Sequence, residues 1–453
     1  MKQTDIRIRE IKAWTEHFDY RTPMKFGGRV VDSVVILNVS AQVESRVGRS
    51  SVGFGSMTMG NAWAWIPQSA TGEQTLAAML EFAQKLAARV GQLSDFGHPL
   101  ELCRTISECY AEVAQETAIE AGLAEDFPIL AALVAASPFE AALFDAYGKL
   151  HGADVFSLLG EDFVNSDLSA YLGAPFSGEY LDRYVLARPK PFMPLYHLVG
   201  GLDPLVDADI PQRLDDGLPE TLGEWILADG LTHLKIKLNG DNLERDVERF
   251  VRVEQATKEA QTLRGVSNWV YSADFNERCP SEEYVLEWLT KTRERTPEGA
   301  ERLQYIEQPT HRDLRRLPRI EMFRAAKIRP VVIDESLVDF QTLLLARELG
   351  YSGVALKACK GLHEALLMGA AAQKFDMFLC VQDLTCPGAS FLLSASLAAH
   401  IPTVAAIEGN ARQYCPTANT TWAARYPTMF GVSEGRIQTG VLHEPGVGFE
   451  FAG

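Results

Sequence analysis

Eight short β-type runs alternate with helical stretches after Leu168, and this alternation constrains the fold more than any other feature of the chain. Strands that alternate with helices are typical of parallel βαβ units, and eight such units fit a closed barrel. We therefore predict an α/β fold, a (β/α)₈ TIM barrel, with functional side chains at the carboxyl ends of its strands. The predicted strands are Met193–Val199, His233–Leu238, Val270–Asp274, Gln304–Glu307, Val331–Asp334, Gly353–Lys357, Met377–Gln382 and Thr403–Glu408.

The chain before the barrel has a different pattern. Short β-type runs lie between Ile6 and Glu44, and helical sequence follows from about Thr75 to Gly160. Strands followed by helices are typical of an α+β unit. A chain of 453 residues with 47% hydrophobic residues has room for two such domains.

Two glycine-rich segments interrupt the N-terminal runs. They are Arg21–Gly28 and Gly53–Gly60, and the second leads into Trp63 and Trp65. Glycines with Met and Trp between strands predict mobile loops that close over something apolar. Ordinary hairpin turns beside a core are the alternative, because glycine often marks turns.

Charge and cysteine content narrow the class of partner and the compartment. The formal net charge is −17, which argues against nucleic acid as a partner and favours a small-molecule ligand. The seven scattered cysteines form no C-x-x-C pair, so we expect reduced thiols in a cytoplasmic protein. We see no apolar run that approaches the roughly 18 residues of a membrane helix and no signal-peptide pattern, so no membrane partner is expected.

Charged residues stand at or near the ends of six predicted strands. In a strand buried on both faces, such a residue loses much hydration energy unless it is paired or bound to a metal. Each charge falls about one βα unit after the last, with one strand skipped, so acids on three successive strands should converge. The alternative is that each charge points into solvent at a strand end, which is reasonable for any one of them. The six are Lys237, Asp274, Glu307, Asp334, Lys357 and Glu408.

The acids and the lysines predict different roles. Three carboxylates without histidines, from Asp274, Glu307 and Asp334, are hard oxygen ligands that suit Mg²⁺, with Mn²⁺ as second choice. Lys235 and Lys237 are two residues apart on one strand, so both side chains face the same way. We expect the two ammonium groups to lower each other's pKa, which suits a base that takes a proton from carbon.

Lys357 extends this prediction to a second base. It lies on the sixth predicted strand, across the barrel mouth from Lys237 on the second. It is therefore expected to act as acid or base on the opposite face of the same carbon.

This ordered set of motifs resembles the enolase superfamily, and within it the muconate-lactonising enzyme subgroup of the mandelate racemase/muconate lactonising enzyme family. The resemblance covers nearly the whole chain. It implies an N-terminal α+β capping domain over residues 1–165, completed by the tail at about 430–453, and a modified (β/α)₈ barrel domain over residues 166–429. The motifs are Lys235-Ile-Lys237, Asp274-Phe-Asn276, Ile306-Glu-Gln-Pro309, Asp334-Glu-Ser336 and Leu356-Lys-Ala-Cys-Lys360.

The resemblance also implies which residues form the site. It implies one Mg²⁺ on the three acids, catalytic lysines at Lys237 and Lys357 with Lys235 in support, and a homo-oligomer. It further implies that loops near Arg21–Gly28 and Gly55–Trp65 set the choice of substrate. The predicted substrate contacts are Arg21, Lys25, Met57, Trp65, Asn276, Asp383 and Glu408.

Two departures from relatives remove substrate classes. The run Ile407-Glu-Gly-Asn410 lacks the Asp-x-Asp that members acting on dipeptides use for the substrate amine, so a dipeptide epimerase is disfavoured. The run Gln382-Asp-Leu384 has no histidine, so the His-Asp base of the mandelate racemase and sugar-acid dehydratase subgroups is absent.

The predicted activity is Mg²⁺-dependent removal of the proton next to a substrate carboxylate, through an enediolate. Bases on the two faces of the substrate carbon favour an isomerase, that is, a racemase or epimerase. A cycloisomerase would use the same lysines, and so would a lyase such as an acid-sugar dehydratase. Two other classes stay open: a Schiff-base enzyme at Lys357 and a non-catalytic binding protein with the same fold.

Overall fold

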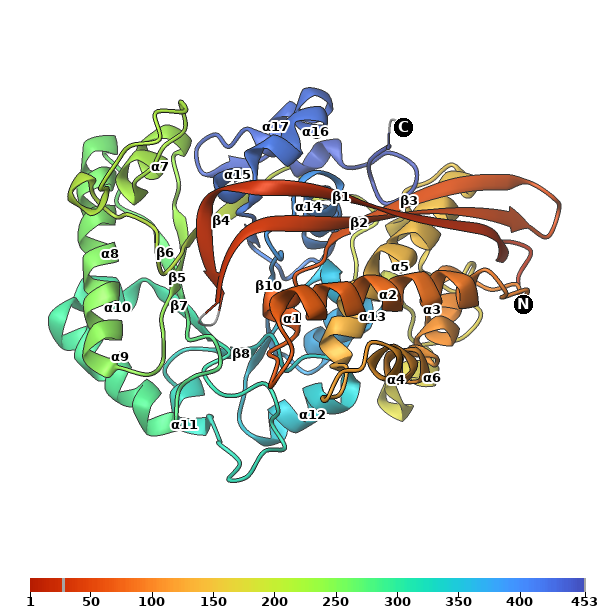
Figure 1. Cartoon of the computed structure of the whole chain (residues 1–453), viewed down its shortest axis with the longest axis horizontal. Coiled ribbons are helices and arrows are strands. Elements are labelled where there is room, and N and C mark those ends of the chain that lie inside the picture. Colours follow the sequence, from red (N-terminus) through yellow and green to blue (C-terminus); the bar gives the residue numbers. More distant parts are fainter. Residues whose placement is uncertain (27–28, 452–453) are drawn as a thin grey trace.

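The computed structural model describes residues 1–26 and 29–451 (Figure 1). Gly27 and Gly28 of the predicted Arg21–Gly28 loop, and the last two residues of the predicted tail, lie outside the described residues. The described chain forms an antiparallel three-stranded sheet of order β1-β2-β3 and a larger sheet of nine strands.

The larger sheet contains a closed barrel of eight parallel strands, which confirms the predicted fold class. The strands follow chain order from β4 to β11, and β11 pairs back with β4. The ninth strand, β12 (Arg436–Ile437), pairs antiparallel with β4. The barrel strands are β4 (Met193–Val199), β5 (His233–Lys237), β6 (Val270–Asp274), β7 (Leu303–Glu307), β8 (Val331–Ile333), β9 (Gly353–Leu356), β10 (Phe378–Val381) and β11 (Ile407–Glu408).

Seven strands lie close to their predicted ranges, and β11 is much shorter than predicted. The range Thr403–Glu408 was expected, but a turn at Pro402–Thr403 delays the ladder until Ile407. The apolar residues 404–406 lie between this turn and the ladder, so the apolar run is longer than the strand that it contains.

Helices follow the strands around the outside of the barrel. Several begin with a side-chain cap just past a strand: Asn242 accepts from the Arg245 N–H, and Asp339 accepts from the Thr342 N–H. The helices of this region are α7 (Leu222–Asp229), α8 (Leu243–Arg264), α9 (Glu282–Arg295), α10 (Pro297–Glu301), α11 (Phe323–Ala326), α12 (Phe340–Glu348), α13 (Leu362–Lys374), α14 (Gly388–His400), α15 (Ala411–Tyr414), α16 (Thr420–Arg425) and α17 (Pro427–Phe430).

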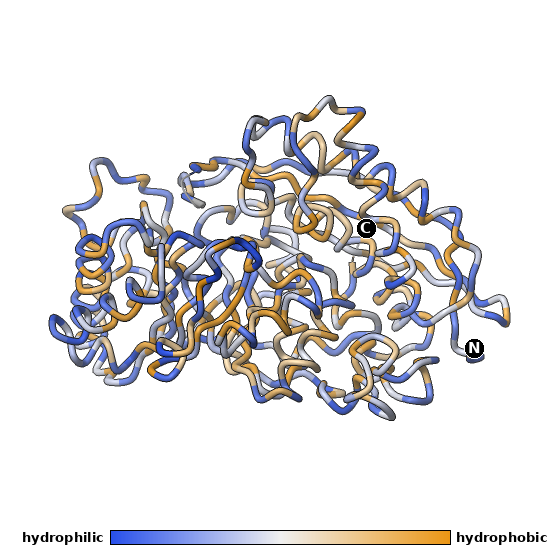
Figure 2. Tube along the Cα trace, turned by 90° about the horizontal axis from the view of Figure 1, so that it is seen from below, coloured by the Kyte–Doolittle hydropathy of each residue, from blue (hydrophilic) through white to orange (hydrophobic). Residues whose placement is uncertain are grey.

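The barrel interior is packed below a charged layer. Tyr196, Tyr305, Val332 and Cys380 belong to one buried cluster contributed by different barrel strands. The Cα of Lys237 pairs with that of Asp274, and Asp274 with Glu307, so these residues lie at one level on neighbouring strands. In Figure 2 the hydrophobic segments run mainly through the middle of the molecule and many hydrophilic ones lie toward its edge.

The N-terminal sheet packs on a long helix. Its strands are β1 (Ile6–Phe26), β2 (Arg29–Ser45) and β3 (Ser50–Thr58), and the helices that follow are α1 (Asn61–Ala64), α2 (Gly72–Val90), α3 (Pro99–Ser107), α4 (Tyr110–Glu120), α5 (Ile129–His151) and α6 (Ser169–Leu172). The β1–β2 hairpin extends from this sheet across to α15 (Figure 1). The hairpin therefore lies near the carboxyl end of the first barrel strand.

The segment Gly53–Thr58 is a buried strand, so its interpretation as a mobile loop is wrong. A Cβ on Gly53 would lie 2.1 Å from the carbonyl oxygen of Ala142 in α5, and one on Gly55 would lie 2.0 Å from that of Pro138. These glycines allow β3 and α5 to approach closely.

Helix α5 is long and apolar enough to cross a membrane by length and composition, which corrects the expectation that no apolar run approaches that length. In the structure, 94% of its apolar 18-residue window is buried inside the protein. A core helix of this kind passes the same test, so it is weak evidence for a membrane span.

The described part of the C-terminal tail contacts the end of α5. The N–H of Val155 donates to the carbonyl oxygen of Gly446 at 2.8 Å, and the N–H of Val447 donates to Asp145 at 3.2 Å. The division of the chain at about residue 165, with the tail assigned to the cap, stays a prediction.

Candidate active site

Three carboxylates from three other barrel strands surround the amino group of Lys235. Its Nζ lies 2.7 Å from Glu307, 2.9 Å from Glu408 and 3.3 Å from Asp274. All four residues are buried, and Lys235 is only 1% exposed. These residues are therefore paired with one another, which removes the alternative that each points into solvent.

A second cluster of charges surrounds Asp334, which follows β8. Lys357 Nζ lies 2.8 Å from one carboxylate oxygen of Asp334, and Lys360 Nζ lies 3.1 Å from the other. Lys360 ends the motif Leu356-Lys-Ala-Cys-Lys360 but was not among the predicted site residues. A 3₁₀ turn over Ala358–Lys360 brings it back beside Lys357, and its spacing of three residues from Lys357 was the available signal.

The two lysines predicted to be catalytic lie on opposite sides of the barrel. Lys237 is the last residue of β5, where its amino group donates to Asp274. Lys357 directly follows β9, and β5 and β9 are four strands apart in a closed ring of eight. The carboxylates of Asp274, Glu307 and Asp334 come from the three intervening strand ends.

The electrostatics of the lysines differ from the prediction. Burial alone would lower the pKa of Lys235, but the carboxylates of Glu307, Glu408 and Asp274 raise it well above its usual value. Burial likewise opposes a charged Lys357, yet Asp334 raises the pKa of that side chain. The expectation that the two neighbouring ammonium groups lower each other's pKa is therefore wrong for Lys235, because the carboxylates dominate.

The carboxylates themselves are crowded. Burial and the charges of Asp274 and Asp334 raise the pKa of Glu307 well above its usual value. Among residues 1–26 and 29–451, no group of three or more His, Cys, Asp or Glu side chains has metal-holding geometry. Lysine amino groups bridge the acids instead. The donor set, three buried carboxylates on successive strand ends, still fits a hard divalent cation, which would relieve this crowding.

Two glutamines hold the acids in place. The amide of Gln382 donates to Glu307, and the side-chain oxygen of Gln308 accepts from the backbone N–H of Asp334 at 2.7 Å. Asn276, predicted as a substrate contact, uses its backbone N–H to hold Asp274 at 2.9 Å and has a positive φ of 49°.

Asp383 and Glu408 lie on the other side of the site, after β10 and in β11. Asp383 is buried and accepts from the backbone N–H groups of Thr385 and Cys386, so it shapes the loop after β10. Burial and the charge of Glu408 raise the pKa of Asp383 to about 7. Glu408 is one of the three carboxylates around Lys235.

The N-terminal residues predicted to contact substrate have partners within the protein, and their contact with substrate stays a prediction. Arg21 donates to Asp216 and to the carbonyl oxygens of Leu218 and Pro219, so it holds the hairpin to the loop before α7. Lys25 is half-buried, and its side chain lies near Gly201.

Met57 and Trp65 are both fully buried. The sulfur of Met57 contacts that of Cys386 at 3.6 Å, which places it next to the loop after β10. The indole N–H of Trp65 donates to Glu125 at 3.2 Å, and its ring packs on Phe127, so it lies among the N-terminal helices.

Trp63 contacts the lysine cluster, although the sequence prediction selected Trp65. Its ring centre lies 4.4 Å from Lys357 Nζ, a cation–π contact. Its indole N–H donates to Glu335 at 2.8 Å. Burial and the charge of Asp334 raise the pKa of Glu335 to about 8. The short helix α1 turns these two tryptophans, two residues apart, toward different neighbours.

The comparisons with known proteins agree with this architecture. The family model described as "Enolase C-terminal domain-like" matches residues 218–452. No curated protein matches the chain significantly.

Solved structures with the same fold cover nearly the whole chain. A dipeptide epimerase from Enterococcus faecalis, complexed with Mg and the dipeptide L-Leu-L-Tyr, has a TM-score of 0.61 at 15% identity, covering 98% of this chain and 100% of that chain. A muconate lactonizing enzyme from Pseudomonas fluorescens, complexed with muconolactone, has a TM-score of 0.59 at 16% identity, with coverage of 98% and 96%. An N-succinyl Arg/Lys racemase from Bacillus cereus has a TM-score of 0.61 at 15% identity, with coverage of 98% and 95%.

At such low identities the structural likeness shows the fold alone. The family model, however, spans more than half of the sequence and includes the strand ends that carry both lysine clusters and all three acids. The chain therefore belongs to the enolase superfamily, in the mandelate racemase/muconate lactonising enzyme family.

Proposed function

We propose that this protein is a Mg²⁺-dependent enzyme that removes the proton next to a substrate carboxylate and returns a proton to the same carbon, as a racemase or epimerase. One observation carries the proposal. Lys237 and Lys357 lie on opposite sides of the barrel mouth, with a row of three buried acids between them. A carbon held above those acids would have an amino group on each face.

The acids and the lysines have different proposed roles. Asp274, Glu307 and Asp334 would hold Mg²⁺, with Mn²⁺ as second choice. When bound, the cation would supply positive charge to stabilise the enediolate that forms after proton removal. Lys237 and Lys357 would each exchange a proton with one face of the carbon. Lys235 supports the site through its contacts with Glu307, Glu408 and Asp274.

The same carboxylates also control the basicity of the lysines. Asp334 stabilises the charged form of Lys357, and that form is the acid that returns a proton. A carboxylate that shares its charge with a divalent cation attracts the ammonium group less. Metal binding is therefore expected to lower the lysine pKa and favour the neutral base.

Two related activities remain alternatives in the proposal. An acid-sugar dehydratase or a cycloisomerase would use the same lysines, and a structurally similar muconate lactonizing enzyme was solved with muconolactone. The runs after β10 and in β11 carry neither the histidine nor the Asp-x-Asp of two other substrate classes. A Schiff-base mechanism is less favoured, because that chemistry has no need of three converging acids. A non-catalytic role is less favoured because all the expected positions carry residue types that suit the chemistry.

Exchange of the substrate α-proton in D₂O tests the shared step. The full chain is incubated with Mg²⁺ and a panel of single-enantiomer hydroxy acids and N-acyl amino acids, and NMR follows deuterium at the α-carbon. A racemase should incorporate deuterium and lose optical purity. Lys237→Ala and Lys357→Ala should each abolish racemisation while one enantiomer still exchanges, because each lysine serves one face.

The matched control is Lys258→Ala, which removes an exposed lysine of α8 that pairs with Glu298. It should exchange like the wild type. Retention of all activity in a Lys237→Ala Lys357→Ala double variant would contradict the proposal, and borohydride trapping without a metal requirement would favour the Schiff-base class.

We also propose a homo-oligomer in the cytoplasm. The resemblance supports the first, and the seven free cysteines of the chain support a reducing compartment. Size-exclusion chromatography with light scattering measures the oligomeric state directly.

A further inference from the structure

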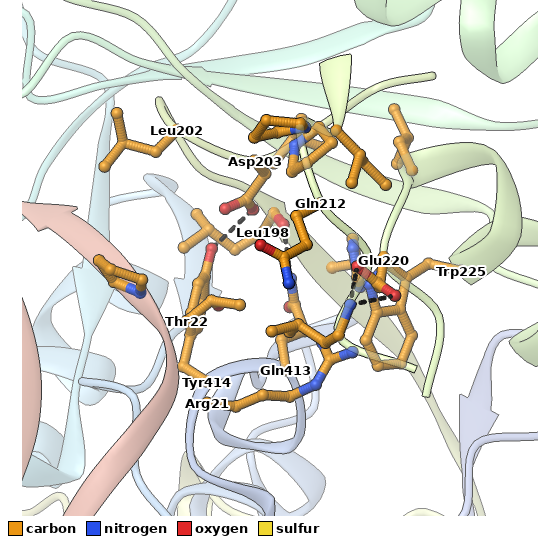
Figure 3. Close-up of a pocket in the computed structure, with 18 residues that line it drawn as sticks. Arg21, Thr22, Leu198, Leu202, Asp203, Gln212, Glu220, Trp225, Gln413 and Tyr414 are labelled. Carbon is orange, nitrogen blue, oxygen red and sulfur yellow. Dashed lines mark hydrogen bonds between the residues drawn. The ribbon is translucent and has the colours of Figure 1, made fainter. Parts of the chain in front are cut away.

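A cavity of about 410 Å³ lies beside the first barrel strand (Figure 3). Its lining includes the end of β4, the loop between β4 and α7, and the start of α7. Residues Arg21–Pro23 of β1 and part of α15 complete it. This volume is in the range of small-molecule sites, about 300–1,000 Å³. The cavity is distinct from the lysine clusters, since its lining includes neither Lys237 nor Lys357.

Most of the cavity wall is apolar. Figure 3 shows Trp225 on one side and Tyr414, joined by a hydrogen bond to Asp203, on the other. Two leucines of the wall are unusually exposed for their type, Leu202 at 51% and Leu214 at 47%. An apolar rim left open to water is typical of a surface that a ligand covers.

The charged groups of the wall are engaged with partners in the protein. Arg21 pairs with Asp216, Asp203 accepts from Tyr414 at 2.6 Å, and Glu220 accepts from the backbone N–H of Leu214 at 3.0 Å. A charged group entering the cavity would lose its hydration and compete with these pairs. The occupant is therefore expected to be uncharged.

Histidine and glutamine complete the polar lining. Burial and the nearby Arg412 hold the pKa of His197 well below its usual value, so this ring is neutral. The side-chain oxygen of Gln413 has no hydrogen-bond partner among the described residues, although its amide donates to the Leu198 carbonyl oxygen. A donor such as an amide N–H on the occupant would satisfy that oxygen.

The cavity is close to the proposed reaction centre. The Cα of Leu198, which lines the cavity, pairs with that of Lys235 on the neighbouring strand β5. Neighbouring strands lie about 4.8 Å apart. Leu198 and Tyr414 also form one apolar cluster with Met24 of β1. The Met24 sulfur contacts Thr385, which lies two residues beyond Asp383. Apolar side chains thus separate the cavity from the site.

We infer that this cavity binds the far end of the carboxylate substrate, and that this end is uncharged and mostly apolar. The inference rests on the proposed function, which places the carboxylate end of the substrate near the Mg²⁺ that the three acids would hold. The substrate class is then a carboxylic acid with an α-hydrogen and an apolar chain or ring at the other end. Dicarboxylates and substrates with a cationic far end are excluded.

Binding of unreactive carboxylates tests the inference without requiring turnover. The probes are 2,2-dimethylalkanoates of increasing chain length, which have no α-proton, titrated calorimetrically into the full chain with MgCl₂. Affinity should rise by about fourfold for each methylene that enters the cavity. An added terminal carboxylate on the longest probe should cancel most of that gain.

Variants at the exposed rim test whether the rise in affinity with chain length arises in this cavity. Leu202→Trp and Leu214→Trp should reduce the affinity for the longest probe at least tenfold and leave the shortest probe unchanged, because their larger side chains fill the cavity entrance. The matched control is Leu263→Trp, at a residue of α8 that is 77% exposed and is not part of the cavity lining. It should bind every probe like the wild type.

Two outcomes would overturn the inference. One is an affinity that does not rise with chain length, and the other is an equal rise in the Leu214→Trp and Leu263→Trp variants. The proposed function fails differently, through absence of α-proton exchange in D₂O. A gain with chain length that Leu214→Trp removes, in a protein without exchange, would support the cavity and refute the activity.

Discussion

Replacing Lys235 with methionine should destabilise the protein strongly in the absence of a divalent cation. The Lys235 amino group is the shared counterion of Glu307, Glu408 and Asp274, at 2.7, 2.9 and 3.3 Å. Methionine keeps much of the side-chain volume and removes the charge. Three buried carboxylates would then face one another with less compensation.

The size of the effect follows from this geometry. Removing one partner of a buried ion pair costs about 3–5 kcal/mol. Because Lys235 is 1% exposed and has three partners, we expect the upper end, about 5 kcal/mol. That is a large fraction of the 5–15 kcal/mol stability of a typical protein. A divalent cation at about 100 times its Kd would return about 2.7 kcal/mol.

The assay is thermal unfolding in EDTA and in MgCl₂. We expect the Lys235→Met variant to melt about 10 °C below the wild type in EDTA and to gain more from MgCl₂ than the wild type does. Lys190→Met is the matched control, because Lys190 donates to the carbonyl oxygens of Ile401 and Val404 and not to acids. The argument is refuted if Lys235→Met melts like the wild type in EDTA, or if MgCl₂ stabilises the Lys190→Met variant to the same additional extent.

Three further predictions follow from individual contacts. Gly55→Ala should lower the free energy of unfolding by about 3 kcal/mol, because its Cβ would lie 2.0 Å from the carbonyl oxygen of Pro138. The measurement is unfolding in urea, and an unchanged urea midpoint would contradict this packing. Trp63→Leu removes the ring over Lys357 and should slow deuterium exchange about tenfold for the enantiomer that Lys357 serves, whereas equal slowing of both enantiomers would indicate a general structural effect. Glu335 has its pKa raised from 4.5 to about 8, so the folded wild type binds an extra proton in this range and loses stability as pH rises through it. Without divalent cations, Glu335→Gln should therefore gain stability relative to the wild type between about pH 5 and about pH 9, and a constant difference across that range would disprove the link.

The barrel could be predicted because its strands are buried on both faces. Such strands read as short apolar runs, and a charged residue at the end of each run stands out. The predicted and observed bounds of β6 are the same, Val270–Asp274. The prediction was weaker for β11, where the apolar sequence continues through a turn that only the backbone reveals.

The charge balance of the site could not be predicted from strand positions. The spacing of Lys235 and Lys237 shows that two amino groups share a face, which suggested mutual repulsion. It does not show how many carboxylates reach each amino group, because Glu307 and Glu408 come from β7 and β11. Their attraction outweighs the repulsion and raises the pKa of Lys235.

The predicted loops Arg21–Gly28 and Gly53–Gly60 were the parts of the structure hardest to predict. Glycines at positions 53 and 55 suggested a mobile loop, but they serve the close approach of a strand to α5, which lies about 80 residues further along the chain. Arg21 stays a predicted substrate contact, and the acid that it pairs with, Asp216, belongs to a loop 195 residues away. Neither relation leaves a local pattern in the sequence.

The sequence by itself determined the fold class, the order of the barrel strands and the residue types at their carboxyl ends, because these depend on local periodicity and on the cost of burying charge. Only the tertiary structure decided which charges pair, which tryptophan lies over Lys357 and where an uncharged cavity opens beside β4. These features depend on distances between side chains far apart in the chain, and such distances exist only after the barrel has closed and the N-terminal hairpin has packed near its mouth.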